Sequence, residues 1–260
     1  MGVNMLIYTH IAIAFRENLL GTSYATLGYA IAVLLLVSSV LLFPQIVSAV
    51  LRFRPLADLE LKSRIDAAFL EAGLSPGRVL VWKPKRKIAN AAIIGWFPGN
   101  QNLILTDVMI ELFPHDELMA IVRHEIGHIK QKHPLKRLGL AFLPLAFLIL
   151  DFVCHWGLYH SLAACAVPGA EFLILIGYVT YLQWLTSSQF PKMEFEADLF
   201  SIQNPQGQSM TPRVQSMCGG LRRFAAIYPA ELTRKGGPHP SLFDRITRLE
   251  RQDLDSASAS

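Results

Sequence analysis

Charged residues are scarce in this chain of 260 residues, because Asp, Glu, Lys and Arg together make up only 17% of it. A soluble globular domain carries about 25%. The mean hydropathy is +0.35 and 52% of the residues are apolar, which excludes an intrinsically disordered protein, since disorder requires low hydropathy and high charge. Three cysteines without a Cys-x-x-Cys pair are too few for a small disulfide-stapled domain. The composition therefore points to a membrane-associated protein.

The charge deficit is concentrated in long apolar segments. Tyr24–Phe43 is uncharged over 20 residues, and such a helix would be about 30 Å long, the thickness of one bilayer core. Leu138–Leu158 and Ala166–Leu185 are also long enough to span, and the break at Gly157–Pro168 between them predicts a hairpin. Buried helices of a large soluble core are the alternative, as is a signal peptide for the first segment. We expect about three transmembrane helices.

Basic residues occur mainly in Arg52–Arg137 and Lys192–Arg251, whereas the turn Cys154–Gly169 has none. By the positive-inside rule, both polar blocks face the cytoplasm and together form one domain interrupted by the hairpin. The predicted division is residues 1–51 for an N-terminal tail and transmembrane helix, 52–137 for the first part of the domain, 138–190 for the hairpin, 191–252 for the second part and 253–260 for a disordered tail.

Turn residues and apolar periodicity predict a small sheet and several helices in the polar blocks. The expected strands are Arg78–Trp82, Ile88–Trp96 and Asn102–Thr106. The expected helices are Leu59–Ala72, a short one over Val108–Phe113 capped by Asp107, one from Pro114 to about His133 that Pro134 closes, and Lys192–Ile202.

One motif carries chemistry. His124 and His128 frame a His-Glu-x-x-His sequence, and on a helix two residues four apart lie on one face, where both imidazoles can bind one ion. Glu125 lies one step round the helix, within reach of a water on that ion. Zinc is suited to two nitrogens, a carboxylate and an open fourth position, and Glu125 would then act as the general base. Two surface histidines beside a Glu, or an inactive protein that has kept the motif, are the alternatives.

A third metal ligand is sought among the acids of Glu194–Asp198. Glu194 and Asp198 share a helix face, and Glu196 points elsewhere. Glu194 is therefore a sensible ligand, with Asp198 behind a histidine, where it would hold the far ring nitrogen. A solvated acidic face is the plainer alternative.

Several stretches occur together in one order along Leu56–Leu249: Asn90-Ala91, Leu105-Thr106-Asp107, Asp116-Glu117-Leu118, His124–His133, Glu194–Asp198 and His239–Ile246. In these stretches the chain resembles the membrane zinc metalloprotease family of the HtpX heat-shock protease and the CAAX prenyl endopeptidase. The resemblance implies an α+β, gluzincin-type integral membrane fold with a small sheet and a His-Glu-x-x-His helix.

The same resemblance implies specific roles. His124, His128 and Glu194 would bind one Zn²⁺ per chain, Glu125 would be the catalytic base, and Asp198 would support the site. Other positions are expected with plain alternatives beside them. Asn90 is expected on a substrate-binding edge strand, or else as a turn residue. His239 is expected to contact the oxyanion, or else to begin a helix. Arg245 is expected to pair with Asp198, or else to lie on the surface, and His133 is expected in helix-end packing.

We therefore expect a membrane-embedded zinc endopeptidase that hydrolyses peptide bonds of membrane or membrane-proximal proteins with a Glu-activated zinc-bound water, in protein quality control. Its expected partners are a polypeptide substrate and the lipid bilayer, without nucleic acid. Its expected place is the inner (plasma) membrane, with the catalytic domain in the cytoplasm. A signalling protease that cleaves a repressor, and a non-catalytic zinc-containing membrane scaffold, are the alternatives; an intact Glu125 argues against the scaffold, because a structural site needs no base.

Overall fold

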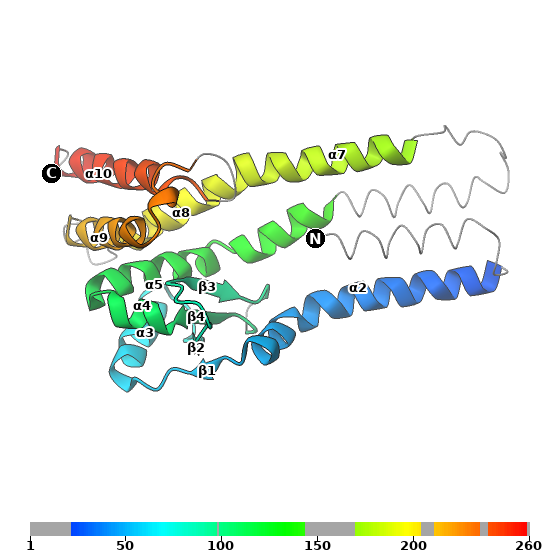
Figure 1. Cartoon of the computed structure of the whole chain (residues 1–260), viewed down its shortest axis with the longest axis horizontal. Helices are drawn as coiled ribbons and strands as arrows, with labels where there is room; N and C mark the ends of the chain where they lie inside the picture. Colours follow the sequence, from blue (N-terminus) through cyan, green and yellow to red (C-terminus); the bar gives the residue numbers. More distant parts are fainter. Residues whose placement is uncertain (1–21, 98, 144–169, 204–210, 235–238, 259–260) are drawn as a thin grey trace. The chain divides into compact units, whose positions relative to one another are not determined.

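The computed structural model describes residues 22–97, 99–143, 170–203, 211–234 and 239–258 (Figure 1). The chain divides into two compact units, Met1–Val50 and Leu51–Ser260. Each unit is described by itself below.

Helix α2 (Thr22–Leu51) forms the described part of the first unit and contains no charged residue. Its large apolar side chains are exposed, with Leu34 and Leu35 each at 64% and Val50 at 71%. Among the described residues, no helix combines the length and the apolarity that crossing a bilayer requires. The expected span Tyr24–Phe43 is thus helical, but its described part does not meet the length and apolarity that a membrane span requires.

The second expected span, Leu138–Leu158, lies mostly outside the described residues, as does the hairpin turn. The described part of the third is helix α7 (Ala170–Trp184). Helix α7 continues through a π-helical turn, η1 (Leu185–Gln189), into α8 (Phe190–Ile202). Pro191 lacks an N–H and its ring would collide with the carbonyl four residues earlier in a regular helix, so the wider turn before it lets the helix continue.

The second unit contains a four-stranded sheet in the order β1-β2-β4-β3. The strands are β1 (Arg54–Pro55), β2 (Arg78–Trp82), β3 (Ala91–Ile94) and β4 (Asn102–Thr106). Strands β2 and β4 are parallel, and β3 pairs antiparallel with β4, which leaves β3 at the sheet edge. The predictions of β2 and β4 are confirmed.

Strand β3 is shorter than the predicted Ile88–Trp96. It ends at Gly95, whose φ of 123° is one that side-chain-bearing residues rarely adopt. A Cβ at Gly95 would lie 2.3 Å from the carbonyl oxygen of Asn100. The chain therefore has to turn at this glycine, which sets the length of the edge strand.

Side-chain capping hydrogen bonds determine where the first two helices of this unit begin. Asp58 accepts a hydrogen bond from the backbone of Leu61 and begins α3 (Leu59–Glu71). Helix α4 (Asp107–Leu112) is capped by Thr106, whose hydroxyl accepts from the Met109 N–H. The prediction that Asp107 caps this helix is thus wrong by one residue.

Helix α5 (His115–Lys130) is the central helix of the unit and contacts α3, β3, α8 and α9 (Figure 1). It ends three residues earlier than predicted. Lys132 adopts a left-handed conformation with φ 58°, and residues 133–143 are helical again. Pro134 therefore does not close α5 but lies in the first turn of the next helix, where its missing N–H leaves no hydrogen bond unmade.

The C-terminal part consists of α9 (Thr211–Ile227), the short 3-10 turn η2 (Pro229–Glu231) and α10 (Leu242–Ser258). The predicted disordered tail 253–260 is wrong up to Ser258, because α10 continues that far. A hydrogen bond from the Thr211 hydroxyl to the Asp253 carboxylate, 2.9 Å long, ties this helix end to α9.

One apolar core joins the sheet to the surrounding helices. Its most deeply buried large side chains come from α3, β4, α4, α5, α8, α9 and α10, and they are Leu61, Ile65, Leu103, Leu105, Met109, Leu118, Ile126, Ile202, Met217, Leu221 and Leu249. Helix α5 thus presents apolar residues to the core, and its remaining face is free to carry polar chemistry.

Candidate metal centre

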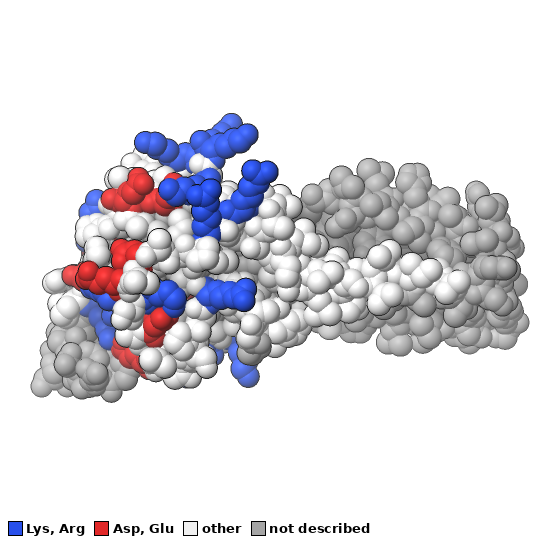
Figure 2. Space-filling view, turned by 90° about the horizontal axis from the view of Figure 1, so that it is seen from below, with Lys and Arg blue, Asp and Glu red and all other residues white. Residues whose placement is uncertain are grey.

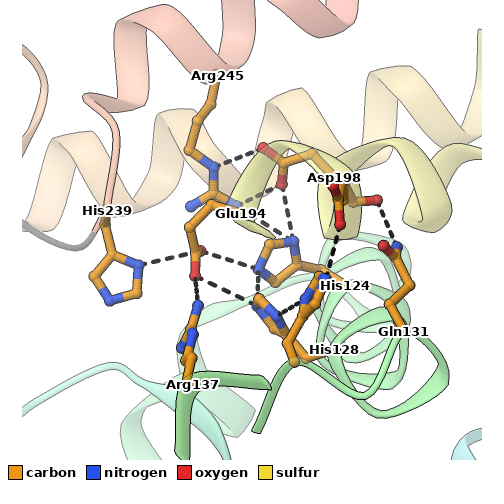
Figure 3. A network of polar contacts seen from close by, with 10 residues as sticks. His124, His128, Gln131, Arg137, Glu194, Asp198, His239 and Arg245 are labelled. Carbon is orange, nitrogen blue, oxygen red and sulfur yellow. Dashed lines mark hydrogen bonds and ion pairs between the residues drawn. The ribbon is translucent and has the colours of Figure 1, made fainter. Parts of the chain in front are cut away.

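Three donor side chains converge between α5 and α8 (Figure 3). His124 and His128 lie one turn apart on α5, and their Nε2 atoms are 3.2 Å apart. Glu194 on α8 places Oε2 3.5 Å from the Nε2 of His124 and Oε1 3.5 Å from the Nε2 of His128. All three side chains are buried, so this group could hold a metal ion.

The spacing of the three donors fits zinc. Ligand atoms at about 2.0–2.1 Å from a tetrahedral zinc lie roughly 3.3 Å from one another. The two histidine Nε2 atoms are 3.2 Å apart, and each lies 3.5 Å from a different oxygen of Glu194. Two imidazole nitrogens and one carboxylate also form a donor set that zinc prefers. The three residues thus each offer one donor atom within 4.8 Å of the others, a group that could hold the ion.

Close contact between α5 and α8 makes this convergence possible, and Gly127 permits it. A Cβ at Gly127 would lie 3.0 Å from the Cδ1 of Phe200 and 3.3 Å from the Cα of Ala197. A side chain there would require Phe200 and the α8 backbone at Ala197 to give way by a few tenths of an ångström. The glycine inside the motif thus brings the Glu194 helix within reach of the histidines.

Asp198 and Arg245 hold the far side of His124, as Figure 3 shows. The Asp198 Oδ1 lies 2.9 Å from the His124 Nδ1. Arg245 on α10 donates two hydrogen bonds to the same carboxylate, from Nε at 2.8 Å and from Nη2 at 2.6 Å. Both predicted contacts, of Asp198 with a site histidine and of Arg245 with Asp198, are present in the structure.

Glu194 and Asp198 stay ionised although both are buried. Burial alone would raise the pKa of Glu194 and of Asp198, but the hydrogen bonds from His124 and His239 to Glu194, and the Arg245 charge beside Asp198, lower both pKa values well below the usual range. Burial opposes a charged His124, yet the Asp198 carboxylate outweighs it and raises the pKa of His124 to about 9. The carboxylates thus favour a positive charge at the place where the donors meet.

The pKa of His128 shifts in the opposite direction from that of His124. Burial, followed by the nearby His124 charge, lowers the pKa of His128 to about 2. The His128 ring is therefore neutral at physiological pH, the form that binds a metal. Burial likewise raises the pKa of Glu125 to about 7, close to the pH at which a general base exchanges protons efficiently.

A cleft of about 240 Å³ opens beside these residues. It is lined by Ala89, Asn90, Ala91, Ile121, His124, Glu125, Glu194, Met217, Leu221, Phe224, Tyr228, Glu231, His239, Pro240, Leu242 and Arg245. Glu125 reaches this cleft, as the motif predicts. Asn90 lies in it directly before the edge strand β3, and the Nδ1 of His239 is 3.1 Å from the Glu194 Oε2.

Three residues of the site were not foreseen as such. Arg137 donates to the Glu194 Oε1 over 2.6 Å and lies over the Phe190 ring, and no sequence signal marked it. His133, predicted as helix-end packing, instead lies against His128, and Glu196 contacts His133. Pro134 could have indicated that His133 begins a new helix, because proline also favours the first turn of a helix.

Known proteins resemble this chain at both the sequence and the fold level. A "Protease HtpX homolog" of Aeropyrum pernix is 27% identical over 141 residues, which are 54% of this chain and 44% of that protein. A "CAAX prenyl protease 1 homolog" of Taenia solium is 22% identical over 264 residues, 85% of this chain and 56% of that one. The chain thus spans about half the length of these relatives.

The fold also matches a solved structure. The crystal structure of S. mikatae Ste24p superimposes with a TM-score of 0.61 at 20% identity, over 95% of this chain and 63% of that one. The observed architecture is thus a mostly helical, Ste24p-like fold with a small sheet. The model of "Peptidase family M48" matches residues 55–253, which include every donor of the metal centre. The chain therefore belongs to peptidase family M48.

Proposed function

We propose that this chain is a zinc-dependent endopeptidase that cuts membrane or membrane-proximal polypeptides. The observation that carries the proposal is the convergence of His124, His128 and Glu194, whose donor atoms lie within 4.8 Å of one another, with Glu125 in the adjoining cleft. A purely structural site would close all four positions with protein ligands. Three donors beside an open cleft are instead typical of a catalytic site.

The roles of the residues follow from their positions. His124, His128 and Glu194 would hold the ion, and the chemistry that zinc supplies when bound is Lewis acidity and a water of lowered pKa. Glu125 lines the cleft together with His124 and Glu194. Its carboxylate would take the proton of the attacking water and deliver it to the departing amine nitrogen. His239, close to Glu194, would contact the oxygen of the scissile carbonyl as negative charge develops on it.

The cleft would hold the substrate as an extended strand. Strand β3 ends the sheet beside the cleft, and an edge strand offers backbone groups to a peptide that adds alongside it. Asn90, directly before β3, would help to align the peptide. The facing wall contains the apolar residues Ile121, Met217, Leu221 and Phe224, which would accept an apolar substrate side chain next to the scissile bond.

A membrane location is supported by the surface of the chain. Half or more of the side chains of Leu27, Leu34, Leu35 and Val50 on α2 is exposed, and large apolar patches of this kind mark contact surfaces for lipid or protein. Figure 2 shows Lys, Arg, Asp and Glu side chains on the second unit, whereas α2 has none. We propose the inner membrane, with the catalytic unit on the cytoplasmic side, where basic residues accumulate, and a role in turnover of damaged membrane proteins.

Zinc content of the purified chain in detergent tests the site. Wild type should hold about one zinc per chain, and Glu194→Ala should lose it, because two histidines alone bind zinc weakly. Glu231→Ala is the matched control, since Glu231 lines the same cleft but is not among the donors. Wild type should also degrade casein, stop on chelation and recover with added zinc. Unaltered zinc binding by Glu194→Ala would contradict the proposed ligand set.

A further inference from the structure

A third buried histidine lies behind the candidate metal centre. His133 is 0% exposed, and its Nδ1 is 2.8 Å from the Nδ1 of His128. Its other ring nitrogen, Nε2, is 3.0 Å from the Oε2 of Glu196. His128, His133 and Glu196 therefore form a continuous chain of hydrogen bonds that begins at a metal donor and ends at a carboxylate that is about half exposed. We call it the His128 relay.

The protons of the His128 relay can be placed by chemistry. A carboxylate only accepts, so the Nε2 of His133 carries a proton and donates it to Glu196. A neutral imidazole has one donor and one acceptor nitrogen, so the Nδ1 of His133 accepts. The Nδ1 of His128 must then donate, which leaves the Nε2 of His128 without a proton. That nitrogen is the one that faces His124 and Glu194.

The two metal-facing histidines are thus oriented by different means. The Nδ1 of His124 contacts the Asp198 carboxylate directly, at 2.9 Å. The Nδ1 of His128 reaches a carboxylate, that of Glu196, through the His133 imidazole. A metal-binding histidine typically donates its far N–H to a carboxylate or carbonyl, which fixes its ring and tautomer. The relay gives His128 this support at a longer range.

The backbone after α5 is shaped to make the relay. In an unbroken helix, a residue five positions after His128 would point away from it. The left-handed Lys132 ends α5 and returns the chain, so that His133 faces His128. The Gln131 side chain also donates to the Glu196 carbonyl over 2.9 Å (Figure 3). The turn is therefore fastened to α8 at the residue that completes the relay.

We propose that His133 and Glu196 are positioning residues that hold His128 with its Nε2 unprotonated and aimed at the metal. This inference rests on the proposed zinc site. All three acids of the Glu194–Asp198 segment then serve the site, with Glu194 as donor, Asp198 behind His124 and Glu196 behind His128. Loss of an outer partner of a metal-binding histidine typically lowers metal affinity 10- to 100-fold.

The test is the zinc dissociation constant of the full chain in detergent, measured by competition with a coloured chelator. His133→Phe keeps the ring volume and removes the acceptor. Glu196→Ala removes the final acceptor, and Glu196→Gln retains a carbonyl oxygen that can accept from His133. His115→Phe and Glu111→Ala are matched controls, because both side chains are exposed and neither is in the relay.

His133→Phe should weaken zinc binding about 10- to 100-fold, and Glu196→Ala about 10-fold. Glu196→Gln and both controls should stay within about threefold of wild type, a rescue that a merely structural role of Glu196 does not predict. The double variant His133→Phe/Glu196→Ala should be no weaker than His133→Phe alone, since the two residues act in series.

Wild-type affinity in Glu196→Ala, or a double variant whose loss is the product of the two single losses, would overturn the relay. Glu196 is partly exposed, so Glu196→Ala decides the matter even where His133→Phe fails to fold. A wild-type chain that binds no zinc would instead refute the zinc site itself, a result that is readily told apart from a failure of the relay alone.

Discussion

Arg245 and Asp198 form a buried ion pair whose loss should be felt in both folding and metal binding. Each side chain is less than a tenth exposed, and two hydrogen bonds join them. Arg245→Met would leave the Asp198 charge buried with no guanidinium beside it. Breaking a buried pair on one side costs about 3–5 kcal/mol. We expect a fall of this size in the free energy of unfolding, measured by denaturant titration in detergent.

Arg222→Met is the matched control for that experiment. Arg222 pairs with Glu250 between α9 and α10, but both side chains are about half exposed. Exposed pairs contribute about 0–1 kcal/mol, so this variant should unfold almost like wild type. Equal losses in the two variants would show that Arg245 acts only as a surface charge.

Residues that act through helical spacing could be predicted from the sequence. His124 and His128 lie one turn apart, and Glu194 and Asp198 do too, so their shared faces followed from local geometry. Resemblance then favoured Glu194 as the ligand. His133 was misjudged, because its position depends on the backbone turn at Lys132 and not on helical periodicity.

Gly127 sets the distance between α5 and α8, and a methyl group there should disturb the site. Gly127→Ala would place its Cβ about as close to Phe200 and Ala197 as the 3.0 and 3.3 Å measured for an ideal Cβ. Overpacking of this kind costs about 1–3 kcal/mol. We expect reduced thermal stability together with weaker zinc binding, because the two histidines and Glu194 come from the helices that are pushed apart.

Gly139→Ala controls for the change of residue type. Gly139 lies in the helical segment 133–143, and a Cβ there meets no atom within 4 Å. Alanine favours a helix over glycine by up to about 1 kcal/mol, so this variant should be as stable as wild type or more so. A Gly127→Ala chain with wild-type stability and zinc affinity would contradict the close-packing account.

At the level of elements, boundaries set by local chemistry were predicted well. Helix α3 begins at Leu59 as predicted, and β2 and β4 lie where their apolar runs predicted. The end of α5 was not predicted correctly, because Pro134 is compatible both with ending one helix and with beginning the next. The tail 253–260 was predicted to be disordered, but α10 continues to Ser258 and is tied to α9 by the hydrogen bond between Thr211 and Asp253.

For the whole molecule, the exposed apolar surface of α2 predicts tight membrane attachment. The full chain should stay in the pellet when cell membranes are washed with alkaline carbonate. Leu34→Lys/Leu35→Lys should move a clear fraction to the supernatant, because each charge disfavours apolar contact. Leu59→Lys changes a leucine that is 79% exposed on α3 and should leave the pellet unchanged. Complete extraction of the wild-type chain by carbonate would contradict the proposed membrane location.

Cleavage by a Glu125→Gln variant tests the central claim, that this M48 chain hydrolyses peptide bonds with Glu125 as its base. Glutamine keeps the size of the side chain but cannot accept the proton, and Glu125 is not among the metal donors. The variant should therefore bind zinc like wild type, while casein cleavage falls at least about 100-fold, as expected for the loss of a general base. Equal cleavage by the two proteins would contradict the account.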